Sequence, residues 1–126
     1  MTNENPPLMN LPEQPGEYKI VQFYNDHQPY LRFGIKPGRY GDFHELILER
    51  FADEIGVKCT QIRGPDGLVS ALPDSVSYRV SGAGMCKVNP RERTAIFSES
   101  SHDYEMGINQ DHLQRLRTVF PEWQIS

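Results

Sequence analysis

The sequence contains too few cysteines to be held together by disulfides. Among its 126 residues there are only two, Cys59 and Cys86, and they form neither a Cys-x-x-Cys pair nor the spacing of a zinc finger. A chain of this length can bury enough apolar surface to fold without cross-links or a structural metal. Two unclustered thiols are typical of a reducing compartment. We therefore expect a cytoplasmic protein that needs no metal and no cofactor.

Long hydrophobic runs are also missing. No stretch approaches the roughly 20 apolar residues that a membrane-spanning helix requires. Residues 1–16 lack both the basic region and the apolar region of a signal peptide. The expectation is a protein that neither enters a membrane nor is secreted.

The chain also has fewer basic than acidic residues. Lys and Arg number 13 against 17 Asp and Glu, the net charge is −4, and the basic residues are scattered along the chain. Proteins that bind nucleic acid through its phosphates need a concentrated basic surface. We expect no nucleic-acid partner, and we expect the chain to be a monomer.

The residues that are present predict one α+β domain over residues 16–126. Residues 1–15 are rich in proline and polar residues, which favours a mobile arm. Alternating and helical patterns predict a mixed, mostly antiparallel sheet with two main helices. The expected strands are 18–23, 30–35, 57–62, 76–80, 85–88 and 94–98, with a last short one near 123–125, and the expected helices are 42–55 and 109–119. Residues 64–75 are expected to form a loop, with Leu68, Val69 and Leu72 covering the core.

The segment from Asp42 to Ile55 is the clearest helix. Asp42 and Glu45 have the spacing of a capping box, and Gly56 supplies a stop. His44 falls within the arc of the apolar residues Phe43, Leu46, Ile47, Phe51 and Ile55, so its ring is expected to point inward at the first turn. The unpaired N–H groups and positive dipole end there favour anions and a neutral imidazole.

His44 is the first candidate functional residue, with two interpretations open. A neutral imidazole is what a general base or a nucleophile needs. Alternatively, the ring is structural and bonds a backbone carbonyl at the edge of the core. Lys19 has a similar pair of interpretations: it either reaches an anion or faces solvent.

The polar segment from Ser98 to Tyr104 is a further candidate, because its hydroxyl and main-chain N–H groups could hold an anion. Glu99, Asp103 and Glu105 would repel one, so an ordinary polar loop is the alternative. Sharper motifs are missing. Leu48 stands where HExxH needs its second histidine, no GxSxG elbow occurs, and Gly82-Ala83-Gly84 lacks the rest of a phosphate loop.

The order of these segments resembles the Janus/Ocnus family, which includes the small phosphohistidine phosphatases. The matching pieces are Gly16-Glu17-Tyr18-Lys19-Ile20-Val21 for its first strand, Phe43-His44 for its aromatic-His helix start, Gly82-Ala83-Gly84 for its Gly-rich turn, Ser101-His102-Asp103-Tyr104 for its phosphate loop and Phe120-Pro121-Glu122-Trp123-Gln124-Ile125 for its C-terminal run. The resemblance implies that His44 is catalytic, as proton acceptor or transient nucleophile. It also implies that Lys19 pairs with the phosphoryl group, and that main-chain N–H groups of Ser101, His102 and Asp103 hold its oxygens.

The expected function is therefore metal-independent hydrolysis of phosphohistidine or a related phosphoramidate, on a phosphorylated protein or a small molecule. The alternative is a non-catalytic anion-binding or protein-interaction domain on the same scaffold. A third interpretation is a metal hydrolase that uses His44 and glutamates.

Overall fold

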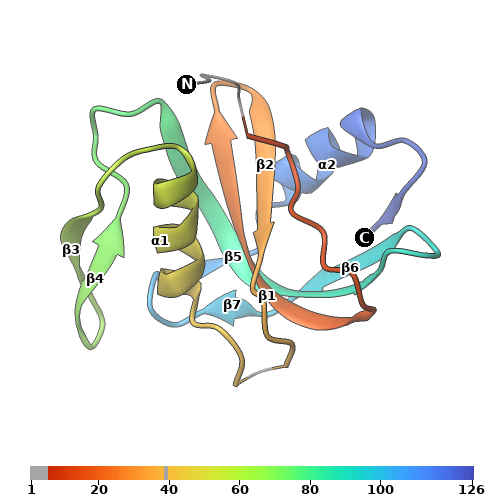
Figure 1. The fold of residues 1–126 in the computed structure, drawn as a ribbon, viewed down its shortest axis with the longest axis horizontal. Helices are drawn as coiled ribbons and strands as arrows, with labels where there is room; N and C mark the ends of the chain where they lie inside the picture. The colour runs from red at the N-terminus through yellow and green to blue at the C-terminus, as the bar shows by residue number, and fades with distance from the viewer. Residues whose placement is uncertain (1–5, 39) are drawn as a thin grey trace.

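A curled five-stranded sheet forms the centre of the molecule (Figure 1). The computed structural model describes residues 6–38 and 40–126. The strands lie in the order β2 (Gln28–Phe33), β1 (Gly16–Asn25), β5 (Tyr78–Asn89), β6 (Thr94–Ser98) and β9 (Gln124–Ile125). Neighbours are antiparallel except β6 and β9, which run parallel. This arrangement confirms the predicted α+β class and the mixed, mostly antiparallel sheet.

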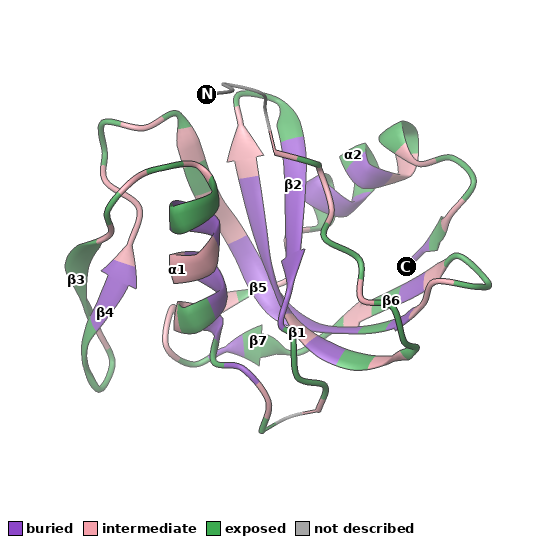
Figure 2. Cartoon of the chain, viewed as in Figure 1, coloured by how far each residue is buried: buried purple, intermediate pink, exposed green. Residues whose placement is uncertain are grey.

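One helix covers each face of the sheet. Successive residues of β1 point to opposite sides, so this strand presents apolar side chains to both helices. Val21 and Phe23 pack with α1 (His44–Glu54), whereas Tyr18 and Ile20 face the cluster that includes α2 (Gln110–Val119). Figure 2 shows the resulting buried band along β1, β2 and β5. Within residues 6–38 and 40–126, no helix is long and apolar enough to cross a membrane.

A separate hairpin lies beside the outer side of α1. It consists of β3 (Thr60–Gly64) and β4 (Gly67–Ala71), which pair antiparallel (Figure 1). The prediction of a loop over residues 64–75 is therefore wrong for its first half. Gly64, Pro65, Asp66 and Gly67 form the turn of the hairpin, and Gly67 adopts a positive φ of 136° that other residues rarely reach.

The two strands predicted at 76–80 and 85–88 are one continuous strand, β5. The expected Gly-rich turn at residues 82–84 lies in its middle, and its glycines serve close approach rather than a change of direction. A Cβ atom on Gly82 would lie 2.2 Å from Oε1 of Gln22, and one on Gly84 would lie 2.6 Å from the carbonyl oxygen of Ser98. The chain segments on either side can therefore pass close to β5 only because side chains are missing there.

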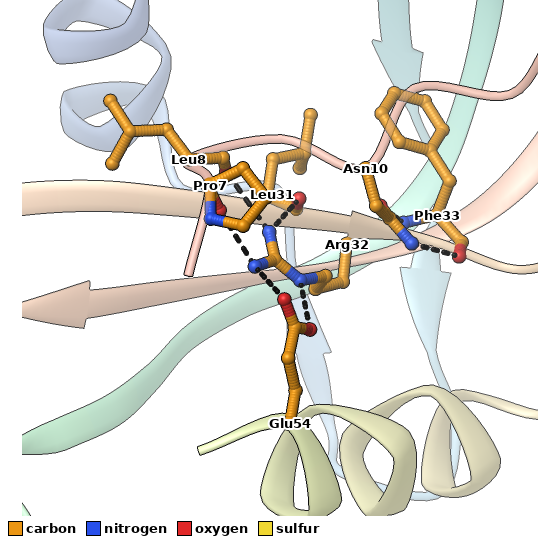
Figure 3. Close-up of polar contacts among 7 residues, drawn as sticks. All are labelled: Pro7, Leu8, Asn10, Leu31, Arg32, Phe33 and Glu54. Atoms are coloured by element: carbon orange, nitrogen blue, oxygen red, sulfur yellow. Dashed lines mark hydrogen bonds and ion pairs between the residues drawn. The ribbon is translucent and has the colours of Figure 1, made fainter. Parts of the chain in front are cut away.

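The N-terminal segment runs along the edge strand β2. Residues 1–5 of the expected mobile arm lie outside the described residues, but Pro7–Asn10 contact β2 through several hydrogen bonds. Arg32 is 2 % exposed and donates to the carbonyl oxygens of Pro7 and Leu8 and to the carboxylate of Glu54 (Figure 3). The Leu31 N–H also donates to the Leu8 carbonyl. Residues 7–10 thus differ from the free arm expected from composition.

Candidate functional site

The loop before α1 is fixed by a buried carboxylate. Asp42 accepts hydrogen bonds from the N–H groups of Ile35 and Lys36 and from the guanidinium of Arg50. Burial alone would raise the pKa of Asp42, but the bonds from Arg50, Ile35 and Lys36 lower it below its ordinary value. The predicted capping box is wrong, because Phe43 occupies the N-cap position and no side chain caps the helix. Asp42 instead sets the position at which α1 begins.

His44 begins α1 and points inward, as predicted. The residue is 6 % exposed, and its Nε2 lies 2.9 Å from the carbonyl oxygen of Gly84. Because a carbonyl can only accept, we assign the ring proton to Nε2, which leaves the lone pair of Nδ1 available as an acceptor. Burial is the main cause of a lowered His44 pKa, and the positive charge of Lys19 acts in the same direction. The bond to Gly84 and the charge of Asp103 oppose this shift.

Lys19 and His44 open into the same pocket, which we call the His44 pocket. It has a volume of about 270 Å³, and its walls are formed by Lys19, Phe43, His44, Met85, Glu99, Ser100, His102 and Asp103. Strand pairing explains part of this convergence, because Lys19 lies opposite Met85 in the register of β1 and β5, next to the Gly84 carbonyl that holds His44. The ammonium of Lys19 lies 5.3 Å from the centre of the Phe43 ring. Two residues predicted from distant parts of the chain are therefore neighbours.

The expected phosphate loop lies between the short strands β7 (Ser100–Ser101) and β8 (Met106–Gly107). Ser101 is buried and its hydroxyl accepts from the N–H of Tyr104, so this side chain supports the turn and does not line the pocket. His102 and Asp103 do line it. In the part of the chain that the structure describes, the main-chain N–H groups of His102 and Asp103 have no protein acceptor. The expected phosphate loop thus contributes His102 and Asp103 to the wall of the His44 pocket.

The His102 ring is directed to the hairpin rather than to His44. Its Nε2 lies 2.9 Å from a carboxylate oxygen of Asp66, and both side chains are largely exposed. Such a surface ion pair contributes little to stability. His102 can therefore serve the pocket through its main chain while its side chain links the β7–β8 turn to the β3–β4 turn.

Two acidic residues make the pocket unusual for an anion site. Glu99 and Asp103 both line it, and the negative charge of Asp103 acts against the lowering of the His44 pKa. A bare phosphate would be repelled by these carboxylates, although Lys19 and the free N–H groups attract it. The wall favours a ligand that carries a positive group next to its anionic one.

The glutamates of α1 are engaged elsewhere. Glu45 accepts from the N–H of Ser70, and Glu49 accepts from its hydroxyl. These bonds attach the hairpin to the outer side of α1, away from His44. Among the described residues, no group of three or more His, Cys, Asp and Glu side chains is arranged to hold a metal ion. The arrangement gives the metal-hydrolase interpretation no support.

Sequence reasoning missed several of the pocket residues. Phe43 was expected on the buried face of α1, yet it is 67 % exposed and forms part of the rim. The feature of the sequence that could have indicated its place in the pocket is its position directly before the inward-pointing His44. Ser100 lies within the polar segment that was already a candidate, although it was not singled out there. Met85 gave no indication in the sequence, because it reaches the pocket through the register of β1 and β5.

The chain was also compared with known proteins. No protein-family model matches it, and no curated protein matches it in sequence.

Proposed function

We propose that this chain is a metal-independent phosphatase that hydrolyses phosphohistidine or a related phosphoramidate, with His44 as general base or nucleophile. The single observation that carries the proposal is the contact of 2.9 Å between His44 Nε2 and the Gly84 carbonyl oxygen. The Nε2–H of His44 is held by this carbonyl, so a bare Nδ1 remains on a neutral ring beside Lys19. A general base needs a proton acceptor that is not already protonated, and a nucleophile needs the same lone pair.

The remaining groups of the pocket have roles that suit phosphoryl transfer. Lys19 balances the charge on the phosphoryl oxygens, and the main-chain N–H groups of His102 and Asp103 donate to them. In the general-base route, Nδ1 takes a proton from water as the water oxygen bonds to phosphorus and the P–N bond breaks. In the nucleophilic route, Nδ1 bonds to phosphorus as the P–N bond of the substrate breaks, and the protonated nitrogen leaves with the electron pair of that bond. Water then attacks the phosphorylated ring, which releases phosphate and restores Nδ1.

The acidic wall supports a phosphoramidate over a phosphate ester. The nitrogen of a phosphoramidate must be protonated to leave, so positive charge is present on the leaving group. Carboxylates within a few ångströms stabilise such a cation. Asp103 and Glu99, which disfavour a plain phosphate, stand where they stabilise this leaving group.

The test is hydrolysis of a phosphohistidine peptide without added metal, comparing wild type with His44→Ala. We expect turnover to fall by at least ~10²-fold, the usual contribution of a positioned acid–base group. His102→Ala is a matched control, because it removes an exposed imidazole from the same pocket and retains the main-chain N–H. Turnover in His44→Ala equal to that of wild type would contradict the assignment.

The second candidate is an anion-binding or interaction domain without catalysis, because Lys19 in the wall of the His44 pocket attracts an anion whether or not a bond is then broken. An NMR titration with inorganic phosphate distinguishes the two. Shifts at His44 and Lys19 without any peptide hydrolysis would favour the binding domain. We also propose the cytoplasm as the compartment, in keeping with the free thiols of Cys59 and Cys86.

A further inference from the structure

A second pocket lies between the β3–β4 hairpin, residues 72–80 and the β7–β8 turn, and we call it the hairpin pocket. We propose that it binds an apolar side chain of the phosphorylated polypeptide whose phosphoryl group lies in the His44 pocket. This inference rests on the proposed function. It narrows the substrate class to a protein or peptide that carries an aliphatic or aromatic residue near the phosphorylated one.

The walls of the hairpin pocket suit an apolar side chain. They include Leu48, Ile62, Val69, Leu72, Val80 and Met106. The volume is about 280 Å³, just below the roughly 300–1,000 Å³ that small-molecule sites occupy. This space suits one large side chain better than a whole cofactor.

Hydrogen bonds fix the walls of the hairpin pocket relative to one another before any ligand binds. The hydroxyl of Tyr104 donates to the carbonyl of Ser70 over 2.6 Å, which joins the β7–β8 turn to the hairpin. Ser70 is in turn bonded to Glu45 and Glu49 on α1. The opposing walls are thus connected by three hydrogen bonds through one buried serine, so a ligand meets a site that needs little rearrangement.

Asp103 connects the two pockets, because it lines both. An extended peptide advances about 3.3–3.6 Å per residue. A chain whose phosphoryl group lies beside His44 therefore passes Asp103 and reaches the hairpin pocket within a few residues. A small phosphoramidate would leave the second pocket empty.

The rim of the hairpin pocket carries charge of both signs. Arg63 and Arg79 line it. Among the described residues, neither of their guanidinium groups has a hydrogen-bond acceptor or an ion-pair partner. Asp74 and Glu105 stand on the same rim. A peptide backbone offers both donors and acceptors, so it complements such a rim, whereas a simple hydrocarbon would leave these groups unpaired.

The experiment scans a phosphohistidine peptide in a Ser/Ala background. A single Leu is placed in turn at each of about four residues on either side of the phosphohistidine, the range that an extended chain needs to pass Asp103. We expect one position to raise kcat/KM about 10-fold or more over the Ala peptide, the usual effect of filling an apolar pocket.

Variants of the protein test the same pocket. Ala71→Phe, which fills the hairpin pocket, and Ile62→Ala, which removes part of its wall, should abolish that preference. Leu68→Ala, on the same hairpin and outside the pocket, should retain it.

A binding measurement keeps this inference separate from the proposed function. Methyl NMR spectra are recorded with non-hydrolysable phosphonate analogues of each Leu peptide and of the Ala peptide. Shifts of the Val69, Leu72 and Val80 methyl groups with a Leu peptide and not with the Ala peptide support the pocket, even if no peptide is hydrolysed. Equal methyl shifts for the Leu and Ala analogues would overturn it, and so would measurable turnover that is the same for all Leu positions. Circular dichroism checks that each variant is folded.

Discussion

At the scale of single residues, His44 shows how one hydrogen bond decides between interpretations. The bond from Nε2 to Gly84 is what a structural histidine needs, yet the same bond leaves Nδ1 unprotonated and available for chemistry. Both interpretations made from the sequence are therefore compatible with this ring. What favours chemistry is the neighbourhood: Lys19 and the His44 ring line one pocket, although they stand on different elements.

Arg32 is the residue for which we expect the largest effect on stability. Its guanidinium donates to Glu54 and to three main-chain carbonyls (Figure 3). The guanidinium carbon also lies 4.8 Å from the centre of the Phe51 ring. Arg32→Met leaves Glu54 and the N-terminal carbonyls without their donor, so we expect a loss of about 3 kcal/mol in the free energy of unfolding. Urea denaturation measures it. Arg79→Met, at an exposed arginine, should change the same quantity by less than about 0.5 kcal/mol; a similar loss in both variants would contradict this account.

At the scale of elements, the two helices begin in different ways. Asn109 caps α2 as expected, since its side-chain oxygen accepts from the N–H of His112 over 3.0 Å. Asp42 does not cap α1, because its carboxylate is drawn to the preceding loop and to Arg50. Spacing alone predicts a cap equally well in both places. The donors that compete for the Asp42 carboxylate are Ile35 and Lys36 in the preceding loop and Arg50 two turns along the helix, and the spacing of a capping box does not include them.

Removing the Asn109 side chain tests this cap. Asn109→Ala should lower the free energy of unfolding by about 1–2 kcal/mol, because the His112 N–H loses its acceptor. The bond from Asn109 Nδ2 to the Ser81 carbonyl is lost as well. Gln110→Ala, at the next and exposed position, should have almost no effect. Thermal or urea denaturation of the two variants gives the comparison, and equal stability would show that the cap contributes nothing.

At the scale of the whole molecule, a buried polar centre joins α2 to the sheet. His112 is fully buried; its Nε2 lies 3.0 Å from the carbonyl oxygens of both Phe23 and Tyr30, and its Nδ1 accepts from Gln22. Gln22 also bonds the main chain of Asn109 in both directions. Burial lowers the pKa of His112 to about 4, against an ordinary value of 6.5, although the bonds to Phe23 and Tyr30 oppose this shift.

This centre predicts a loss of stability in weak acid. Above pH 6.5 the ring is neutral in both folded and unfolded chains, so His112 adds no pH dependence. Between pH 6.5 and about 4 the unfolded chain takes up a proton that the folded chain does not, and the free energy of unfolding falls by about 3 kcal/mol in total. Urea denaturation across this range measures the fall, and an NMR titration of the His112 ring gives its pKa directly. A ring that titrates near 6.5 in the folded protein would contradict the prediction.

The amino-acid sequence by itself determined the α+β class, both main helices, the first hairpin and the inward direction of His44. These follow from local periodicity and from turn residues, which depend only on neighbours along the chain. Tertiary structure alone decided the rest. The glycines of β5 are explained only by segments that lie close against it. Phe43 is exposed because it occupies the N-cap position with extended backbone, so the periodicity of the helix does not direct its side chain. His44 and Lys19 became one candidate site only when β1, β5 and α1 packed together, since contacts between distant segments leave no periodic trace in the sequence.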